Sequence, residues 1–222
     1  MREVCVFDVN ETLLDLGAMD PHFERIFGDR QVRRLWFGQL LQSALVSTVT
    51  GVYIDFGRIG MAALDMTAER AGVRLTDDDR DAVREQMTHL PPHPEVAGAL
   101  GRLRDAGARL ASLTNSTLRV AEAQLGNAGI VDLFEQVLSA DMVRRLKPAP
   151  EPYRMAAEQL GVGLAEVRLV AAHSWDVAGA LRAGCAAAFV ARPGAVLDPL
   201  FERPDIVGAD LDVVADQVLA RS

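Results

Sequence analysis

The sequence is almost free of lysine and poor in cysteine. Lys147 is its only lysine, so every other residue among its 23 lysines and arginines is an arginine. The two cysteines, Cys5 and Cys185, stand far apart within apolar runs. This pattern excludes a disulfide-rich scaffold and favours reduced thiols in a core, so we expect a cytoplasmic protein.

Long uncharged apolar runs are also absent, so we expect no membrane span. Asp8 interrupts the apolar N-terminal run, where a signal peptide needs its hydrophobic centre, so we expect no export. Acidic residues outnumber basic ones by 31 to 23, and the formal net charge is -8. Such a chain repels nucleic acid and anionic membrane surfaces, and we expect neither as a partner.

The composition is otherwise that of an ordinary globular protein. Hydrophobic residues make up 50% of the 222 residues and charged residues 24%, which argues against disorder. The length suits one large domain or a domain that carries an insertion.

Short apolar runs that alternate with helical patterns indicate a parallel α/β sheet. Four such runs occupy residues 4–7, 110–113, 169–172 and 187–190. Helices are predicted between them, because Pro94 and Pro152 stand at helix starts and glycines follow the apolar stripes. A third helix is predicted from about residue 175 to residue 182.

The stretch of residues 15–92 has helical periodicity but no good buried strand. Thr76 followed by three acids is typical of a helix start, and the prolines at positions 91, 92 and 94 mark a boundary. We therefore predict an α/β core formed by residues 1–14 and 93–222, with residues 15–92 inserted as a helical cap.

Asp8 directly follows the apolar run of residues 4–7 and opens a polar loop, DVNET. A carboxylate has no packing use at that point. In open parallel sheets, ligands bind at the carboxyl ends of the strands. We therefore interpret Asp8 as a functional residue.

Four short motifs follow one another at such places. They read FDVNETLLD at residues 7–15, LTNS at 113–116, Lys-Pro at 147–148 and VAAHSWD at 170–176. In this order they resemble the motifs of the haloacid dehalogenase superfamily, and they cover the chain except for the inserted region. One such motif alone would be a weak signal, but four in the same order are specific.

The resemblance implies a three-layer α/β/α, Rossmann-like core with a parallel sheet and an inserted helical cap. It also implies that Asp8 is a covalent nucleophile. An ionised carboxylate needs a cation to hold it and a closed site to desolvate it. Lys147 is the expected cation. Thr12 and Thr114 are expected to donate hydrogen bonds to the nucleophile or to the developing charge.

Most members of this superfamily are Mg²⁺-dependent phosphohydrolases, and the chain departs from them at two positions. Asn10 stands where they carry a general acid, and an amide cannot donate and regain a proton. In the fourth motif Asp176 matches one of their two metal-binding acids, but Ala172 stands at the other. We expect neither metal nor cofactor. A phosphatase with a weakened Mg²⁺ site is the alternative.

The type II L-2-haloacid dehalogenases resemble this chain in those departures. The resemblance implies that Asp8 attacks the halogen-bearing carbon of a small anionic 2-haloacid and displaces halide. Water held by Asp176 or its neighbours then hydrolyses the ester. Halide leaves without a proton, so neither an acid nor a metal is required. The candidate substrate-binding residues are Asn10, Thr114, Asn115, Tyr153, His173, Trp175 and Phe37.

Among these, Asn115 is expected to help hold the halide, and Tyr153 to support Lys147 or the substrate. Phe37 stands where the dehalogenases carry a carboxylate-binding arginine, and a ring cannot make that bidentate bond. Arg33, one helical turn earlier, is predicted to be a solvated charge. His173 replaces an asparagine of the fourth motif and is a candidate to hold halide or carboxylate instead.

A third interpretation is a binding protein that has lost its chemistry. The retention of Asp8, Lys147 and Asp176 favours an enzyme instead. The predicted cap helix is rich in leucine around residues 35–45, and we expect it to support a homodimer.

Overall fold

The computed structural model describes residues 4–221. Its centre is one sheet of six parallel strands in the order β3-β2-β1-β4-β5-β6. The strands are β1 (Val4–Phe7), β2 (Arg109–Thr114), β3 (Gln136–Ser139), β4 (Val167–Ala171), β5 (Ala186–Val190) and β6 (Ile206–Gly208). The site-bearing strand β1 lies in the middle of the sheet, between β2 and β4.

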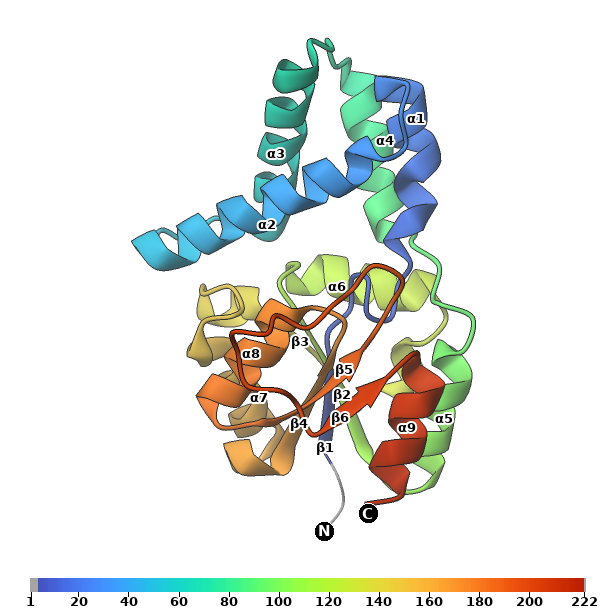
Figure 1. Cartoon of the computed structure of the whole chain (residues 1–222), viewed down its shortest axis with the longest axis vertical. Coiled ribbons are helices and arrows are strands. Elements are labelled where there is room, and N and C mark those ends of the chain that lie inside the picture. The colour runs from blue at the N-terminus through green and yellow to red at the C-terminus, as the bar shows by residue number, and fades with distance from the viewer. Residues whose placement is uncertain (1–3, 222) are drawn as a thin grey trace.

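Helices cover both faces of the sheet, which gives the predicted three layers (Figure 1). One face packs against α5 (Val96–Asp105), α6 (Leu118–Asn127) and α9 (Leu211–Leu219), and the other against α7 (Pro150–Leu160) and α8 (Ser174–Ala183). Alternate side chains of β1 pack on opposite faces of the sheet, because successive strand residues point in opposite directions. Cys5 and Phe7 join the first cluster, and Val4 and Val6 join the second.

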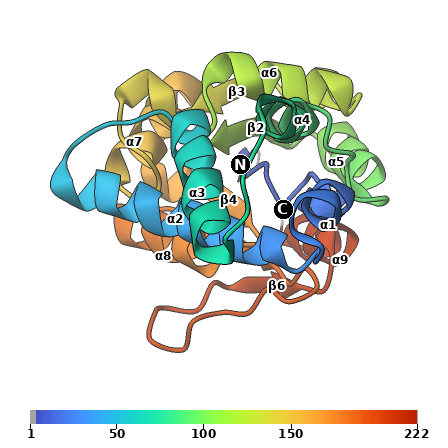
Figure 2. The same ribbon diagram turned by 90° about the horizontal axis from the view of Figure 1, so that it is seen from above.

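Four further helices lie above the carboxyl ends of the strands (Figure 1). They are α1 (Asp20–Phe27), α2 (Val32–Thr50), α3 (Phe56–Ala71) and α4 (Asp77–Thr88). From above, α2 and α3 lie over the strands, and α4, seen end-on, lies next to α6 (Figure 2). Thr76 and Asp79 form the capping box that begins α4, as the sequence predicted.

Two connecting segments join these helices to the sheet. The backbone of Asp15 donates to Pro91 O at 2.8 Å, and that of His93 donates to Leu13 O at 2.9 Å. Short 3₁₀ helices complete the fold at Leu16–Met19, Val131–Leu133, Ala140–Val143 (η3) and Leu164–Glu166. The entry and exit segments of the helical layer therefore run side by side, directly beside the loop that carries Asp8.

The sequence predicted four of the six strands and missed β3 and β6. Both are short, and β3 leaves two of its four residues half-buried. Neither is a continuous buried run of the kind that identified the central strands. Cys5 and Cys185 are both buried as thiols. Within residues 4–221, no helix is both long and apolar enough to span a membrane.

Candidate active site

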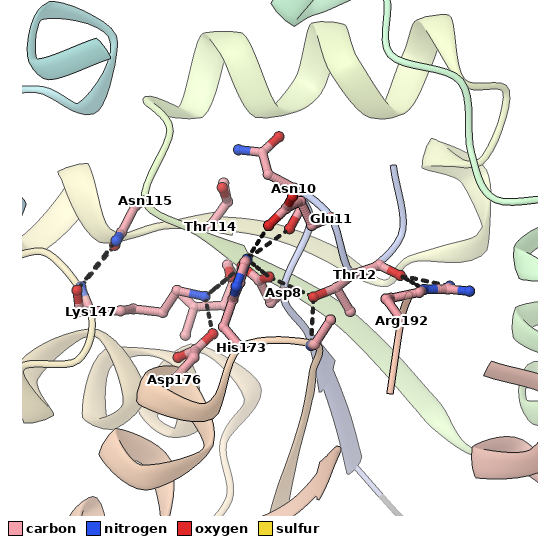
Figure 3. Close-up of polar contacts among 12 residues, drawn as sticks. Asp8, Asn10, Glu11, Thr12, Thr114, Asn115, Lys147, His173, Asp176 and Arg192 are labelled. Atoms are coloured by element: carbon pink, nitrogen blue, oxygen red, sulfur yellow. Dashed lines mark hydrogen bonds and ion pairs between the residues drawn. The ribbon is translucent and has the colours of Figure 1, made fainter. Parts of the chain in front are cut away.

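Polar residues from all four motifs converge at the carboxyl ends of the central strands (Figure 3). Asp8 follows β1, Thr114 ends β2, and His173 stands between β4 and α8. Asp176 lies in the first turn of α8. Lys147 comes from the loop between η3 and α7. Because β1 lies between β2 and β4, these groups surround Asp8.

The Asp8 carboxylate is buried, with 4% of the residue exposed, and its two oxygens have different partners. Oδ1 accepts a hydrogen bond from Lys147 Nζ at 2.9 Å, and Oδ2 accepts one from Thr12 Oγ1 at 2.6 Å. Burial alone would raise the pKa of Asp8, but the charges of Lys147 and His173 and the two hydrogen bonds lower it below its usual value. Asp8 is therefore ionised at neutral pH, as a carboxylate nucleophile must be.

The Lys147 ammonium links the two acids of the site. Nζ donates to Asp8 Oδ1, to Asp176 Oδ2 at 2.6 Å and to Leu113 O at 2.8 Å. An ammonium has three hydrogens, so all of its donors are engaged. Burial would lower the pKa of Lys147, but the two carboxylates outweigh it and raise the pKa. Lys147 is thus charged and fixed in place.

Asp176 is fully buried and bound on both oxygens. Oδ2 accepts from Lys147, and Oδ1 accepts from the Tyr153 hydroxyl at 2.5 Å. Burial raises the pKa of Asp176, Lys147 opposes this, and the charge of Asp8 adds to it, so the pKa ends above its usual value. Tyr153, only 1% exposed, supports Lys147 through Asp176.

Thr12 connects the nucleophile to the end of β4 and to an arginine that the sequence analysis missed. Its hydroxyl accepts from Ala172 N at 2.9 Å while donating to Asp8. Its carbonyl oxygen accepts from Arg192 Nε at 3.1 Å and Nη2 at 2.8 Å. Arg192 is also paired with Glu95. The only available signal was that Arg192 stands two residues after β5, at the same edge of the sheet.

Asn10 and Thr114 bind neighbouring loops. Asn10 Oδ1 accepts from Gln124 Nε2 at 3.0 Å, and Asn10 Nδ2 donates to Ser116 Oγ at 3.4 Å. Thr114 Oγ1 accepts from Ser116 N at 3.2 Å. Its donation to the nucleophile or to the developing charge stays a prediction. Both side chains therefore organise the turn after β2.

Asn115 braces the loop that carries Lys147. Its Oδ1 accepts from Lys147 N at 2.8 Å, and its Nδ2 donates to Lys147 O at 3.3 Å. Asn115, Lys147 and Trp175 also line a small cavity of about 10 Å³, which Leu41 helps to close. This cavity lies beside the predicted halide-binding residue Asn115.

Three aromatic rings stack above Asp8. The His173 ring stacks on the Trp175 ring, and their centroids are 5.1 Å apart. The Phe37 ring of α2 is tilted against the His173 ring, with a centroid distance of 5.9 Å. Lys147 Nζ lies 6.0 Å from the Trp175 ring. Trp175 Nε1 is buried without a hydrogen-bond partner in the described structure, so one donor beside the small cavity is unused.

A wider cavity of about 590 Å³ opens on the other side of this stack. We call it the vestibule. Its lining includes the arginines Arg33, Arg34 and Arg192, the histidines His93 and His173, and the acids Glu11 and Asp15. Phe37 and Trp175 supply apolar surface. A cleft of this charge concentrates small anions although the whole chain is acidic.

The comparisons with known proteins agree with this arrangement. The sequence profile of the haloacid dehalogenase-like hydrolases matches residues 3–184. This chain belongs to that hydrolase family. The chain is 31% identical to haloacetate dehalogenase H-2 of Moraxella sp. (strain B) over 96% of each chain. It is 30% identical to (S)-2-haloacid dehalogenase 2 of Pseudomonas sp. (strain CBS-3), over 96% of this chain and 94% of that one.

Solved structures from the haloacid dehalogenase-like family have the same fold. An L-2-haloacid dehalogenase from Xanthobacter autotrophicus, with chloropropionic acid covalently bound, superposes with a TM-score of 0.93. The two chains are 27% identical, and the match covers 100% of both. The core, the helical layer and the sheet topology of this chain are therefore those of a haloacid dehalogenase-like hydrolase.

Against that family background, one expectation about α2 is wrong. Arg33 was predicted to be a solvated charge, but only 8% of it is exposed. Its guanidinium pairs with Asp20, and Nη1 lies 3.6 Å from Glu11 Oε1. Glu11 has a positive φ of 61°, and it directs its carboxylate toward Arg33 and His173. Tertiary partners, which helix periodicity does not reveal, keep Arg33 buried.

In the sequence, the acids that would bind a metal distinguished the Mg²⁺-dependent phosphohydrolases from the L-2-haloacid dehalogenases. Across residues 4–221, no cluster of three or more His, Cys, Asp or Glu side chains has an arrangement suited to a metal ion. The Asn10 amide, at the position of the phosphatase acid, is engaged by Gln124 and Ser116.

Proposed function

We propose that this hydrolase removes the halogen from small 2-haloalkanoic acids through an ester on Asp8, without a metal or cofactor. The observation that carries the proposal is the state of Asp8. It is buried, ionised, and held by Lys147 and Thr12 beneath an arginine- and histidine-lined vestibule. Two relatives named above are haloacid and haloacetate dehalogenases, and a solved relative carries chloropropionic acid as a covalent adduct.

The first step is an in-line displacement. Asp8 Oδ1 donates an electron pair to the halogen-bearing carbon, the carbon–halogen bond breaks, and halide leaves with its electrons. Lys147 and Thr12 hold the carboxylate at a fixed angle, which supplies part of the rate enhancement by positioning. Halide needs no proton, so the site needs no acid at position 10.

The second step hydrolyses the ester. Water adds to the Asp8 carbonyl carbon and gives one proton to Asp176, whose raised pKa makes it a better base. The bond from that carbon to the substrate oxygen breaks, and Lys147 protonates the departing oxygen. The second proton of the water is released from Asp8 to solvent, which restores the ionised carboxylate. Asp176 and Lys147 are 2.6 Å apart, and proton transfer between them restores both.

Substrate recognition uses the two cavities. The arginines of the vestibule attract the substrate carboxylate, and Leu41 and Trp175 line both the vestibule and the small cavity. We assign Asn115 and the Trp175 N–H to hold the halide as it leaves, because both residues line the small cavity and this N–H has no hydrogen-bond partner among the described residues. Asn10, Thr114 and Tyr153 act indirectly, by fixing the loops and acids around the nucleophile.

We also propose that residues 15–92 act as a cap over a core of residues 1–14 and 93–222, and that the protein works in the cytoplasm as a homodimer. The buried thiols of Cys5 and Cys185 support the location. The end of α2 projects beyond the core (Figure 1), and Leu45, Val46 and Val49 are exposed there. Such an apolar helix end is suited to a second copy of the chain.

The test is halide release from 2-chloropropionate and chloroacetate in the presence of a chelator. We expect release to continue with the chelator and to disappear in Asp8→Asn. Hydrolysis of p-nitrophenyl phosphate that requires added Mg²⁺, without halide release, would instead identify a phosphatase. Binding of haloacids without either reaction would identify a binding protein.

A further inference from the structure

His173 is held in one orientation above the nucleophile. Its ring lies between Trp175 and Phe37, with centroid distances of 5.1 and 5.9 Å. It is the N-cap residue of α8, so its backbone position is fixed by the start of that helix. The side chain is 11% exposed. The ring therefore has little freedom to turn.

Three oxygen atoms face Nε2 of this ring. Asn10 O lies 3.2 Å away, and Asp8 Oδ2 and Glu11 Oε2 each lie 3.8 Å away. A carbonyl and two carboxylates are all acceptors, so Nε2 of this ring carries a hydrogen. His173 thus presents an N–H donor to the edge of the Asp8 carboxylate (Figure 3).

The two carboxylate oxygens of Asp8 therefore have different neighbours. Oδ1 lies against the Lys147 ammonium, whereas Oδ2 has the Thr12 hydroxyl at 2.6 Å and the His173 N–H at 3.8 Å. A 3.8 Å separation is longer than a hydrogen bond in the resting site. Catalytic hydrogen bonds of this kind shorten when charge develops on the acceptor.

We propose that His173 and Thr12 form the oxyanion hole for hydrolysis of the Asp8 ester. The inference rests on the function proposed above and assigns one of its steps. Oδ1 becomes the oxygen bonded to the substrate, and Oδ2 becomes the carbonyl oxygen of the ester. When water adds to the Asp8 carbonyl carbon, the π electrons of that carbonyl move to Oδ2. The negative charge on Oδ2 is stabilised by the two donors until the bond from that carbon to Oδ1 breaks.

The charge balance explains why the second step depends on His173 more than the first does. During displacement, negative charge leaves Asp8 and moves to the halide, so a donor to Oδ2 gives no advantage. During hydrolysis, a neutral ester carbonyl regains a full charge on Oδ2. Loss of one oxyanion-hole donor typically lowers kcat by about 10²–10³-fold.

Two variants separate the donor from the ring. His173→Phe keeps the stack between Phe37 and Trp175 but has no N–H, while His173→Gln keeps an N–H donor but loses the ring. The probe is 2-chloropropionate in excess, mixed rapidly with each enzyme. Halide is followed with time, and the Asp8-containing peptide is examined by mass spectrometry after acid quench.

For His173→Phe we expect a rapid burst of about one halide per active site, followed by turnover slowed roughly 10²–10³-fold, with the ester trapped on Asp8. His173→Gln should recover most of the lost turnover and accumulate less ester. An unchanged steady-state rate in His173→Phe, or a halide burst slowed as much as turnover, would overturn the proposal. An elevated KM with normal ester hydrolysis would assign His173 to the substrate carboxylate instead and would also overturn it.

The same experiment separates this proposal from the general function. Wild-type enzyme that releases halide and forms an Asp8 ester supports the dehalogenase activity, whatever the His173 variants do. Wild-type enzyme that releases no halide contradicts the activity, and the role of His173 in it is then rejected as well.

Discussion

Lys147 Nζ lies 2.9 Å from Asp8 Oδ1 and 2.6 Å from Asp176 Oδ2, so two buried acids share one ammonium. All three side chains are almost inaccessible to solvent. This cation is also the only lysine in the sequence. The arrangement keeps Asp8 ionised and aligned, and it makes Lys147 necessary for both chemistry and stability.

Replacement of Lys147 by methionine should abolish halide release and destabilise the fold. Methionine fills much of the same volume but leaves two carboxylates unpaired, and breaking a buried ion pair typically costs about 3–5 kcal/mol. Urea denaturation and halide release measure the two effects. The double variant with Asp176→Asn should regain part of the stability without activity. Wild-type stability in the single variant would contradict the assigned charge state.

The pH dependence should reflect the lowered pKa of Asp8. Burial raises this pKa, but Lys147, His173 and Thr12 lower it below 3.8. The ionised carboxylate therefore stabilises the fold above that value, and its contribution is lost as the pH falls through the folded-state pKa. Halide release between about pH 5 and pH 7 should show no loss from protonation of Asp8. An acid limb in this range for the wild-type halide burst, which precedes the step that uses Asp176, would contradict the lowered pKa.

Arg192 should matter for turnover although it lies behind the nucleophile loop. Its two donors bind Thr12 O, and lysine cannot make that forked contact. We expect Arg192→Lys to lower kcat and to reduce stability by about 1–3 kcal/mol, with KM less affected. Arg154→Lys, at an exposed position of α7, is the control. Equal kinetics in the two variants would show that Arg192 does not position Thr12.

Phe37→Arg should tighten substrate binding. Phe37 lines the vestibule and contacts the His173 ring, at the position where related dehalogenases are expected to carry an arginine. A guanidinium there can bind the substrate carboxylate, and a charged hydrogen bond is worth about 1.5–3 kcal/mol, so KM should fall roughly tenfold or more. Phe37→Leu, which removes the ring without adding charge, is the control. An unchanged KM in Phe37→Arg would mean that residue 37 does not face the substrate.

The sequence predicted the parts of the molecule that depend on local pattern. The run at residues 4–7 identified β1, and Asp8 followed from its place at the end of a strand. The Thr76 capping motif identified the start of α4. Strand β1 is as short as β3, but all four of its residues are buried, whereas β3 and β6 were missed because neither is a continuous buried run.

The remaining features depend on contacts between residues far apart in the chain. Arg192 binds Thr12 across 180 positions, and Gln124 binds Asn10 across 114. No local pattern marks either partner. Arg33 was misjudged for the same reason, because its burial results from Asp20 and Glu11 rather than from its own helix.

The most direct test of the central claim is a single-turnover reaction in H₂¹⁸O, with enzyme in excess over 2-chloropropionate. If water attacks the carbonyl carbon of an Asp8 ester, the ¹⁸O should appear in the Asp8 carboxylate and the 2-hydroxy acid should be unlabelled. Label in the hydroxy acid, with none in Asp8, would show that water displaces the halide directly and would contradict the covalent mechanism.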